Sequence, residues 1–189
     1  MAEAPPGTVF TVGHSTRSLE ELAGLLSSHG VELLVDVRSL PASRRMPHFS
    51  RARLEEEMPR RDIAYLHLPG LGGRRRPRPG SPNSGWRNAS FRAYADHMGG
   101  ADFQADLERL LELAVARRTA VMCAEAVPWR CHRWLVGDAL VARGRKVLHI
   151  TGPGPPILHR MTPFARVESG RVSYPGPKTE GVREPPPGQ

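Results

Sequence analysis

The sequence is poor in cysteine, poor in lysine and free of long apolar runs. Cys123 and Cys131 are its only cysteines, too few for a disulfide framework and typical of thiols kept in a reducing compartment. No apolar run reaches the roughly 18–20 residues of a membrane span. Residues 1–6 lack the basic and apolar regions of a signal peptide. We therefore expect a cytoplasmic protein with no membrane partner.

Lysine is scarce although the chain is basic. The formal net charge is +8, from 27 Lys+Arg against 19 Asp+Glu, and only Lys146 and Lys178 are lysines. An excess of arginine predicts a phosphate-bearing partner, such as a nucleotide, DNA or RNA. The codon bias of a GC-rich genome would give the same composition. The positions of the arginines, rather than their number, must decide between these explanations.

Strand-like and helix-like segments alternate along the chain. Strand patterns cover residues 8–13, 31–37, 63–68, 119–123 and 146–150, and helical spacing covers residues 19–26, 50–58, 90–98, 102–118 and 134–141. This order predicts an α/β fold with a mostly parallel, Rossmann-like sheet of about five strands and helices on both faces. A small C-terminal hairpin is expected within 165–174. We expect one domain over residues 1–174, followed by a disordered Pro/Gly-rich tail over 175–189.

Polar residues follow four of the predicted strands. They are His14 and Ser15, Asp36 and Arg38, the Gly72-Gly73 turn, and Cys123 with Glu125. In parallel α/β sheets, ligands bind outside the carboxyl ends of the strands. We therefore expect these residues to converge on one rim, although they lie far apart in the sequence.

Reactive side chains are concentrated after the fourth strand. A carboxylate at Glu125 is costly unless it is exposed, ion-paired or functional. Either the loops are held by a structural ion pair, Glu125–Arg133 or Asp36–Arg38, or Glu125 is a general base or nucleophile. Cys131 is expected in the first helical turn, with Pro128 near the first helical position, where free N–H groups and cations lower the pKa of a thiol. The alternative is that Cys131 is a core residue. Cys123 fits a buried strand end better than a catalytic role.

A long basic segment extends from Arg74 to Arg87. Its prolines and glycines exclude regular structure, so we expect a mobile loop of high positive charge. Trp86 would be available to stack on a base. A solvated insertion without function is the alternative.

Five short segments, taken together, resemble one known family. They are Thr11-Val12-Gly13-His14-Ser15, Asp36-Val37-Arg38, Leu71-Gly72-Gly73, Met122-Cys123-Ala124-Glu125 and Cys131-His132-Arg133. In this order and spacing they are similar to the family named domain of unknown function 488, over about residues 8–174. The resemblance implies a small bacterial or archaeal α/β domain with a site at the Cys-x-Glu and Cys-His-Arg segments. Val127 stands where such proteins usually have a polar residue, so no side-chain cap is expected for the helix that follows.

Two classes of function fit these residues. The first is a hydrolase-type enzyme that cleaves a phosphodiester or N-glycosidic bond in a nucleotide or nucleic acid. Glu125 and Cys131 would be its reactive groups, with His14 and Asp36 in support. Arg38 and Arg133 would hold the anion, and the remaining substrate-binding candidates are Ser15, Cys123, His132, Gly72, Gly73 and Trp86. The second class is a non-catalytic nucleic-acid-binding module. A thiol enzyme acting on a small acidic metabolite through Cys131 is a third alternative.

No cofactor is predicted. The chain has no phosphate-binding loop and no Gly-x-Gly-x-x-Gly after the first strand, so neither ATP nor NAD is expected. The seven residues between the cysteines do not match a zinc-finger spacing. A zinc ion held by Cys123, Cys131, His132 and His14 remains the metal alternative.

Overall fold

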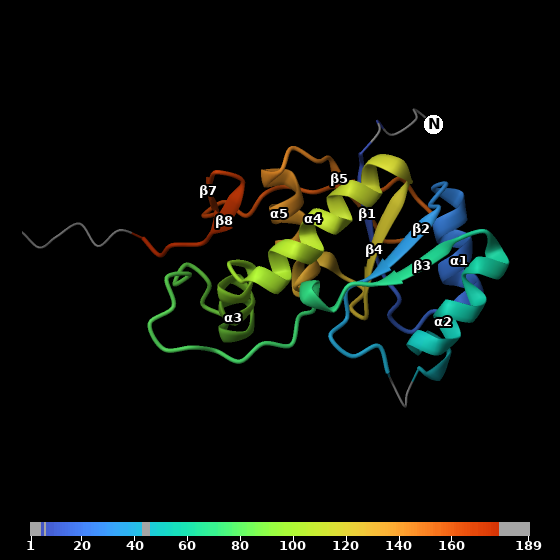
Figure 1. Cartoon of the computed structure of the whole chain (residues 1–189), viewed down its shortest axis with the longest axis horizontal. Coiled ribbons are helices and arrows are strands. Elements are labelled where there is room, and N and C mark those ends of the chain that lie inside the picture. Colours follow the sequence, from blue (N-terminus) through green and yellow to red (C-terminus); the bar gives the residue numbers. More distant parts are fainter. Residues whose placement is uncertain (1–4, 6, 43–45, 178–189) are drawn as a thin grey trace, which may run out of the picture.

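The computed structural model describes residue 5 and residues 7–42 and 46–177, which contain a six-stranded sheet with helices on both faces (Figure 1). The strand order is β3-β2-β4-β1-β5-β6. The strands are β1 (Val9–Gly13), β2 (Leu33–Asp36), β3 (Ala64–His67), β4 (Thr119–Cys123), β5 (Val147–Ile150) and β6 (Ile157–Leu158). The first five pair in parallel and β6 pairs antiparallel with β5. The predicted α/β, mostly parallel sheet is confirmed, and a two-residue edge strand was too short to leave a pattern in the sequence.

In the part of the chain that the structure describes, five α-helices connect the strands. They are α1 (Leu19–Ser28), α2 (Arg51–Glu57), α3 (Ala89–Met98), α4 (Ala101–Ala116) and α5 (Arg133–Ala142). Helices α1 and α2 lie on one side of the sheet, and α3, α4 and α5 lie on the other (Figure 1). The described residues also form four short 3₁₀ helices, each of which begins at a proline: η1 (Pro47–Phe49), η2 (Pro59–Arg61), η3 (Pro69–Leu71) and η4 (Pro128–Arg130).

Helix α1 begins where its sequence predicts. The Ser18 hydroxyl accepts a hydrogen bond from the Glu21 amide at 3.1 Å, and the Glu21 carboxylate accepts one from the Ser18 amide at 2.6 Å. This reciprocal capping satisfies two donors at the helix start. The buried side chains of the helix are Leu19, Leu22, Ala23 and Leu26. Their helical spacing places them together on the face that meets the sheet.

Alternation along the strands divides the core between the two faces of the sheet. In β1, Val9 packs with the α3–α5 side, whereas Phe10 and Val12 pack with the α1–α2 side. The same rule applies beyond the strand ends, because successive side chains of an extended chain point to opposite faces. This alternation determines which side chains at the carboxyl ends of the strands lie on the same face of the sheet and can contact one another.

The C-terminal part of the domain contains the expected hairpin. Strands β7 (Arg166–Glu168) and β8 (Arg171–Ser173) pair antiparallel, and Ser169 and Gly170 between them adopt φ values of 48° and 75°. Residues 178–189, most of the segment predicted to be a disordered tail, lie outside the described residues. None of the described helices combines the length and the apolar character that a membrane span would need.

Candidate functional site

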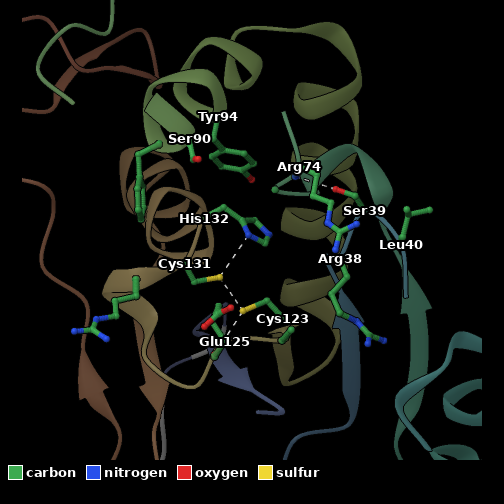
Figure 2. A pocket seen from close by; sticks show the side chains of 14 residues that line it. Arg38, Ser39, Leu40, Arg74, Ser90, Tyr94, Cys123, Glu125, Cys131 and His132 are labelled. Carbon is green, nitrogen blue, oxygen red and sulfur yellow. Dashed lines mark hydrogen bonds between the residues drawn. The ribbon is translucent and has the colours of Figure 1, made fainter. Parts of the chain in front are cut away.

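A cavity of about 310 Å³ opens beyond the carboxyl ends of β2 and β4 (Figure 2). It is lined by residues from the loop after β2, the loop after η3, helix α3 and the β4–α5 connection. These residues are Arg38, Ser39, Leu40, Gly73, Arg74, Ser90, Phe91, Tyr94, Cys123, Ala124, Glu125, Arg130, Cys131 and His132. The volume lies at the lower end of the range for small-molecule sites.

The two cysteines of the chain face each other in this cavity (Figure 2). Cys123 is the last residue of β4, and its Sγ atom lies 2.8 Å from the Sγ atom of Cys131. Both thiols are free and buried. The prediction that Cys131 lies in the first turn of its helix is wrong. Pro128 opens the separate turn η4 instead, and Cys131 follows it with extended dihedrals, two residues before α5 begins.

The hydrogen bond between the thiols gives them different acidities. Burial raises the pKa of Cys123, but the hydrogen bond from Cys131 and the charge of Arg133 outweigh burial, so the net pKa is lowered. For Cys131, the hydrogen bond to Cys123 and then burial raise the pKa well above its usual value. Cys123 is therefore the thiol that favours the thiolate form, and Cys131 is its donor. The sequence suggested the opposite assignment.

Arg133 lies buried beneath the loop that follows β4. Its side chain is 1% exposed, and Nη2 donates to the Ala126 carbonyl at 3.2 Å. Within the described residues, Nε and Nη1 have no hydrogen-bond partner. No carboxylate in that part of the chain forms an ion pair with this guanidinium, so the expected Glu125–Arg133 pair is not present there. Arg133 does not line the cavity, and it acts on the site through its charge.

Gly13 allows the loop after β4 to approach β1 closely. A Cβ atom at this position would lie 1.8 Å from the Glu125 carbonyl oxygen and 3.0 Å from Nη1 of Arg133. Gly73 has a similar role at the cavity wall, because a Cβ atom there would lie 2.3 Å from Nδ1 of His132. Glycine is therefore required at both positions for close approach rather than for an unusual dihedral. Gly72 packs in the same way against Ser39, but it does not line the cavity.

His132 connects the thiol pair to the end of β2. Its Nε2 lies 3.1 Å from the Val37 carbonyl oxygen, and its Nδ1 lies 3.4 Å from Cys131 Sγ. A carbonyl only accepts hydrogen bonds, so Nε2 carries the proton and Nδ1 is left unprotonated beside Cys131, whose single S–H points to Cys123. Burial lowers the pKa of His132 to about 4. The imidazole is therefore neutral near pH 7.

Glu125 is exposed at the cavity mouth, with its carboxylate beside the thiols (Figure 2). It forms no ion pair with any described residue. A carboxylate that follows an apolar strand would be costly to bury, but Glu125 is exposed and water solvates its charge, so this cost does not arise. The carboxylate is free to act on a bound ligand or on water.

Asp36 and Arg38 belong to a polar cluster on the opposite face of the sheet. The Arg38 guanidinium donates to both Asp36 oxygens, at 2.5 Å to Oδ2 and 2.9 Å to Oδ1, and to the Phe49 carbonyl at 2.7 Å. Tyr65 donates to Asp36 at 2.8 Å. These bonds hold the guanidinium in place, although Arg38 also lines the cavity wall.

His14 completes this second cluster. Its Nε2 lies 3.3 Å from Nη1 of Arg38, and its ring stacks on Phe49 with centroids 4.3 Å apart. Burial, together with the charge of Arg38, lowers the pKa of His14 to about 4. The Ser15 amide donates to the Ala124 carbonyl at 2.9 Å, with Ser15 at a φ of 51°. Neither residue, nor Asp36, lines the cavity, so the predicted rim is divided between two faces.

Trp86 packs within an aromatic cluster of the protein. Its ring stacks on Phe91 with centroids 4.8 Å apart and also contacts Phe164 and Tyr174. The Trp86 ring, which was expected to stack on a nucleic-acid base, is therefore used in packing within the protein. The exposed arginines of the basic segment are Arg74, Arg76, Arg78 and Arg87. Of these, Arg74 reaches the cavity.

Sequence reasoning missed the contribution of helix α3. Tyr94 is 1% exposed, donates to the Leu71 carbonyl at 2.7 Å and meets His132 edge-on, with ring centroids 5.1 Å apart. Ser90 and Phe91 line the same wall. On an amphipathic helix these residues look like core or surface, so no local signal identified them. Arg74 and Arg130 were visible as basic residues beside the motifs.

Within the part of the chain that the structure describes, no three His, Cys, Asp or Glu side chains are grouped so as to hold a metal ion.

Comparisons with known proteins assign the family. No curated protein and no solved structure matches the chain. The family model "Domain of unknown function DUF488" matches residues 18–140. This match spans β2 to β4, both cysteines and most of α5, and the chain therefore belongs to the DUF488 family.

Proposed function

We propose that this protein is an enzyme that hydrolyses a phosphate ester, with a nucleotide or the end of a nucleic acid as substrate and Cys123 as nucleophile. One observation carries the proposal. A thiol with a lowered pKa lies in a cavity that is also lined by the guanidinium-bearing residues Arg38, Arg74 and Arg130. Thiolates are strong nucleophiles, and arginine binds phosphate oxygens in bidentate fashion.

The reaction would proceed in two steps. In the first, the Cys123 thiolate attacks phosphorus, an S–P bond forms, and the P–O bond to the alcohol breaks. The alcohol leaves as an alkoxide and takes a proton from water. In the second step, the Glu125 carboxylate takes a proton from a water molecule whose oxygen attacks phosphorus. The S–P bond breaks, and the thiolate and inorganic phosphate are released.

The charges at the cavity favour a phosphate over a neutral substrate. Arg74 and Arg130 are exposed and form no ion pair with described residues. Their charge is therefore available to a ligand, whereas that of Arg38 is shared with Asp36. Guanidinium groups at the developing charge of a phosphoryl-transfer transition state contribute to catalysis.

The exposed arginines of the loop after η3 favour a polymeric substrate as a second candidate. Arg76 and Arg78 continue the basic surface that begins with Arg74 at the cavity. A nucleic acid strand would make salt-dependent contacts with such a surface. If the cavity residues had only a structural role, this surface would make the protein a nucleic-acid-binding module.

The test is phosphate release from a panel of mononucleotides, sugar phosphates and 5′-phosphorylated oligonucleotides. Cys123→Ser is expected to lower kcat/KM by about a thousandfold, and Glu125→Gln by about tenfold to a hundredfold. The double variant Arg76→Gln/Arg78→Gln lies away from the thiols and is the matched control. It should leave mononucleotide hydrolysis unchanged and weaken only the reaction with oligonucleotides.

Two outcomes would contradict the proposal. Turnover that survives Cys123→Ser would exclude the thiolate as nucleophile. Salt-dependent oligonucleotide binding without turnover, unchanged in Cys123→Ser and Glu125→Gln, would assign the protein to the binding modules.

A further inference from the structure

The two thiols of the cavity lie close enough to react with each other. Cys123 Sγ and Cys131 Sγ are 2.8 Å apart, and a disulfide needs about 2.05 Å. Both are free thiols, and no other cysteine occurs in the chain. Cys131 belongs to neither η4 nor α5, so a small shift of the loop between them can bring its sulfur into bonding distance without breaking a helix.

We propose that the Cys123–Cys131 pair is an oxidation site, at which a small hydroperoxide converts the two thiols into a reversible disulfide. The consequence for activity rests on the function proposed above, because the nucleophile would be consumed. The oxidation itself does not depend on that function. It requires only the two thiols and a route for the oxidant.

The chemistry divides into an attacking thiol and a resolving thiol. The Cys123 thiolate attacks one peroxide oxygen, an S–O bond forms and the O–O bond breaks. The other oxygen leaves as water or an alcohol after taking a proton from solvent, and Cys123 becomes a sulfenic acid. Cys131 then attacks the Cys123 sulfur and loses its proton, and the hydroxyl group leaves as water. The peroxide is reduced by two electrons, and the two thiols are oxidised by two.

The environment suits each sulfur to its part. Arg133 lies buried near Cys123, and two of its nitrogen atoms have no hydrogen-bond partner among the described residues, so its positive charge favours a thiolate there. Cys131 is already in contact with the sulfur that it would attack. A resolving thiol at this position would trap the sulfenic acid before a second peroxide could oxidise it further.

The cavity restricts which oxidants can reach the pair. Cys123 is 1% exposed and Cys131 is 4% exposed, but both line the cavity. Hydrogen peroxide and short alkyl hydroperoxides can enter a volume of about 310 Å³, whereas a folded protein cannot. A small dithiol such as dithiothreitol can enter by the same route and reverse the reaction.

The test is intact-mass measurement of the full-length protein after treatment with hydrogen peroxide near pH 7. A disulfide lowers the mass by about 2 Da, since two hydrogen atoms are lost. Peptide mapping without reduction should show Cys123 joined to Cys131, and dithiothreitol should restore the original mass. A protein that gains oxygen without forming this link, or keeps both thiols free, would overturn the proposal.

Single variants separate the two roles. Cys131→Ser should stop at the sulfenic acid, which dimedone labels at Cys123. Cys123→Ser should be labelled much less, because it lacks the thiol that is assigned to attack the peroxide. Equal labelling of the two variants would contradict the assignment. If phosphate-ester hydrolysis is found, the oxidised protein should lose at least tenfold in rate and recover with dithiothreitol. If none is found, the mass measurement still decides the oxidation on its own.

Discussion

At the scale of single residues, the buried cation Arg133 and the buried thiol Cys123 complement each other. A guanidinium that is removed from water costs several kcal/mol unless a charge or hydrogen bonds compensate. Among the described residues, the Arg133 guanidinium makes one hydrogen bond, to the Ala126 carbonyl, and no carboxylate pairs with it. Ionisation of Cys123, which the charge of Arg133 favours, would supply the missing negative charge. The two groups therefore stabilise each other in the ionised state.

Replacement of Arg133 by methionine is expected to raise the pKa of Cys123, because the favourable charge is lost. The rate at which iodoacetamide alkylates Cys123 near pH 7 should fall about tenfold, with the pH–rate profile displaced upward. Peptide mass spectrometry follows the labelled residue. Arg133→Lys keeps the charge and is the control; it should restore much of the rate. If Arg133→Met is folded by circular dichroism and its pH–rate profile is unchanged, the charge of Arg133 does not control the acidity of Cys123.

At the scale of elements, the sequence predicted the strands and helices but not how they divide the site. Asp36 lies two residues after Leu34, and His14 lies two after Val12, so both continue the α1–α2 face. Cys123 lies two residues after Val121, on the other face. Counting in steps of two along each strand therefore assigns these residues to different faces from the sequence alone. The expectation of one rim relied on strand ends alone.

Other features of the site could not be predicted from local patterns. The 2.8 Å contact between the cysteines depends on η4, whose single turn redirects the chain between two longer elements. The wall formed by Tyr94 depends on how α3 docks against the sheet. Both arise from tertiary packing. The acidity of each thiol follows from that contact, so it was also beyond prediction.

Substitution of Gly13 tests whether the fold requires the close approach of the loop after β4 to β1. Gly13→Ala places a methyl group against the Glu125 carbonyl and should displace the loop that carries Glu125 and leads to Cys131. We expect a loss of about 2–4 kcal/mol in the free energy of unfolding, as for overpacked sites with little room to relax. Chemical denaturation measures it.

A second glycine provides the matched control. Gly24 lies within α1, and a Cβ atom there would meet nothing within 4 Å. Gly24→Ala should stabilise the protein by about 0.5–1 kcal/mol, since alanine favours the helix. If Gly13→Ala were as well tolerated as Gly24→Ala, the close approach of the loop would not be a requirement of the fold.

At the scale of the whole molecule, histidines that are buried in the neutral state make the stability of the fold depend on pH. The pKa is lowered to about 4 in His14 and His132 and to about 3 in His149, in each case chiefly by burial. His149 is 1% exposed and lies 2.7 Å from the Thr11 hydroxyl and 3.0 Å from His159. These side chains come from different strands and loops, so their protonation would act on the whole domain rather than on one element.

The native state should therefore lose stability as the pH falls from about 6.5 to about 4. In the unfolded chain each histidine binds a proton near its ordinary pKa of 6.5, whereas the folded state resists protonation until about pH 4. Each such histidine contributes a slope of up to about 1.4 kcal/mol per pH unit. Urea unfolding at intervals between pH 7 and 4.5 measures the combined slope. His14→Asn removes one titrating group, so its slope should be smaller by about that amount, whatever its stability at pH 7. A wild-type stability that stays constant from pH 6.5 to 5, or an equal slope in His14→Asn, would show that these imidazoles are protonated in the folded protein.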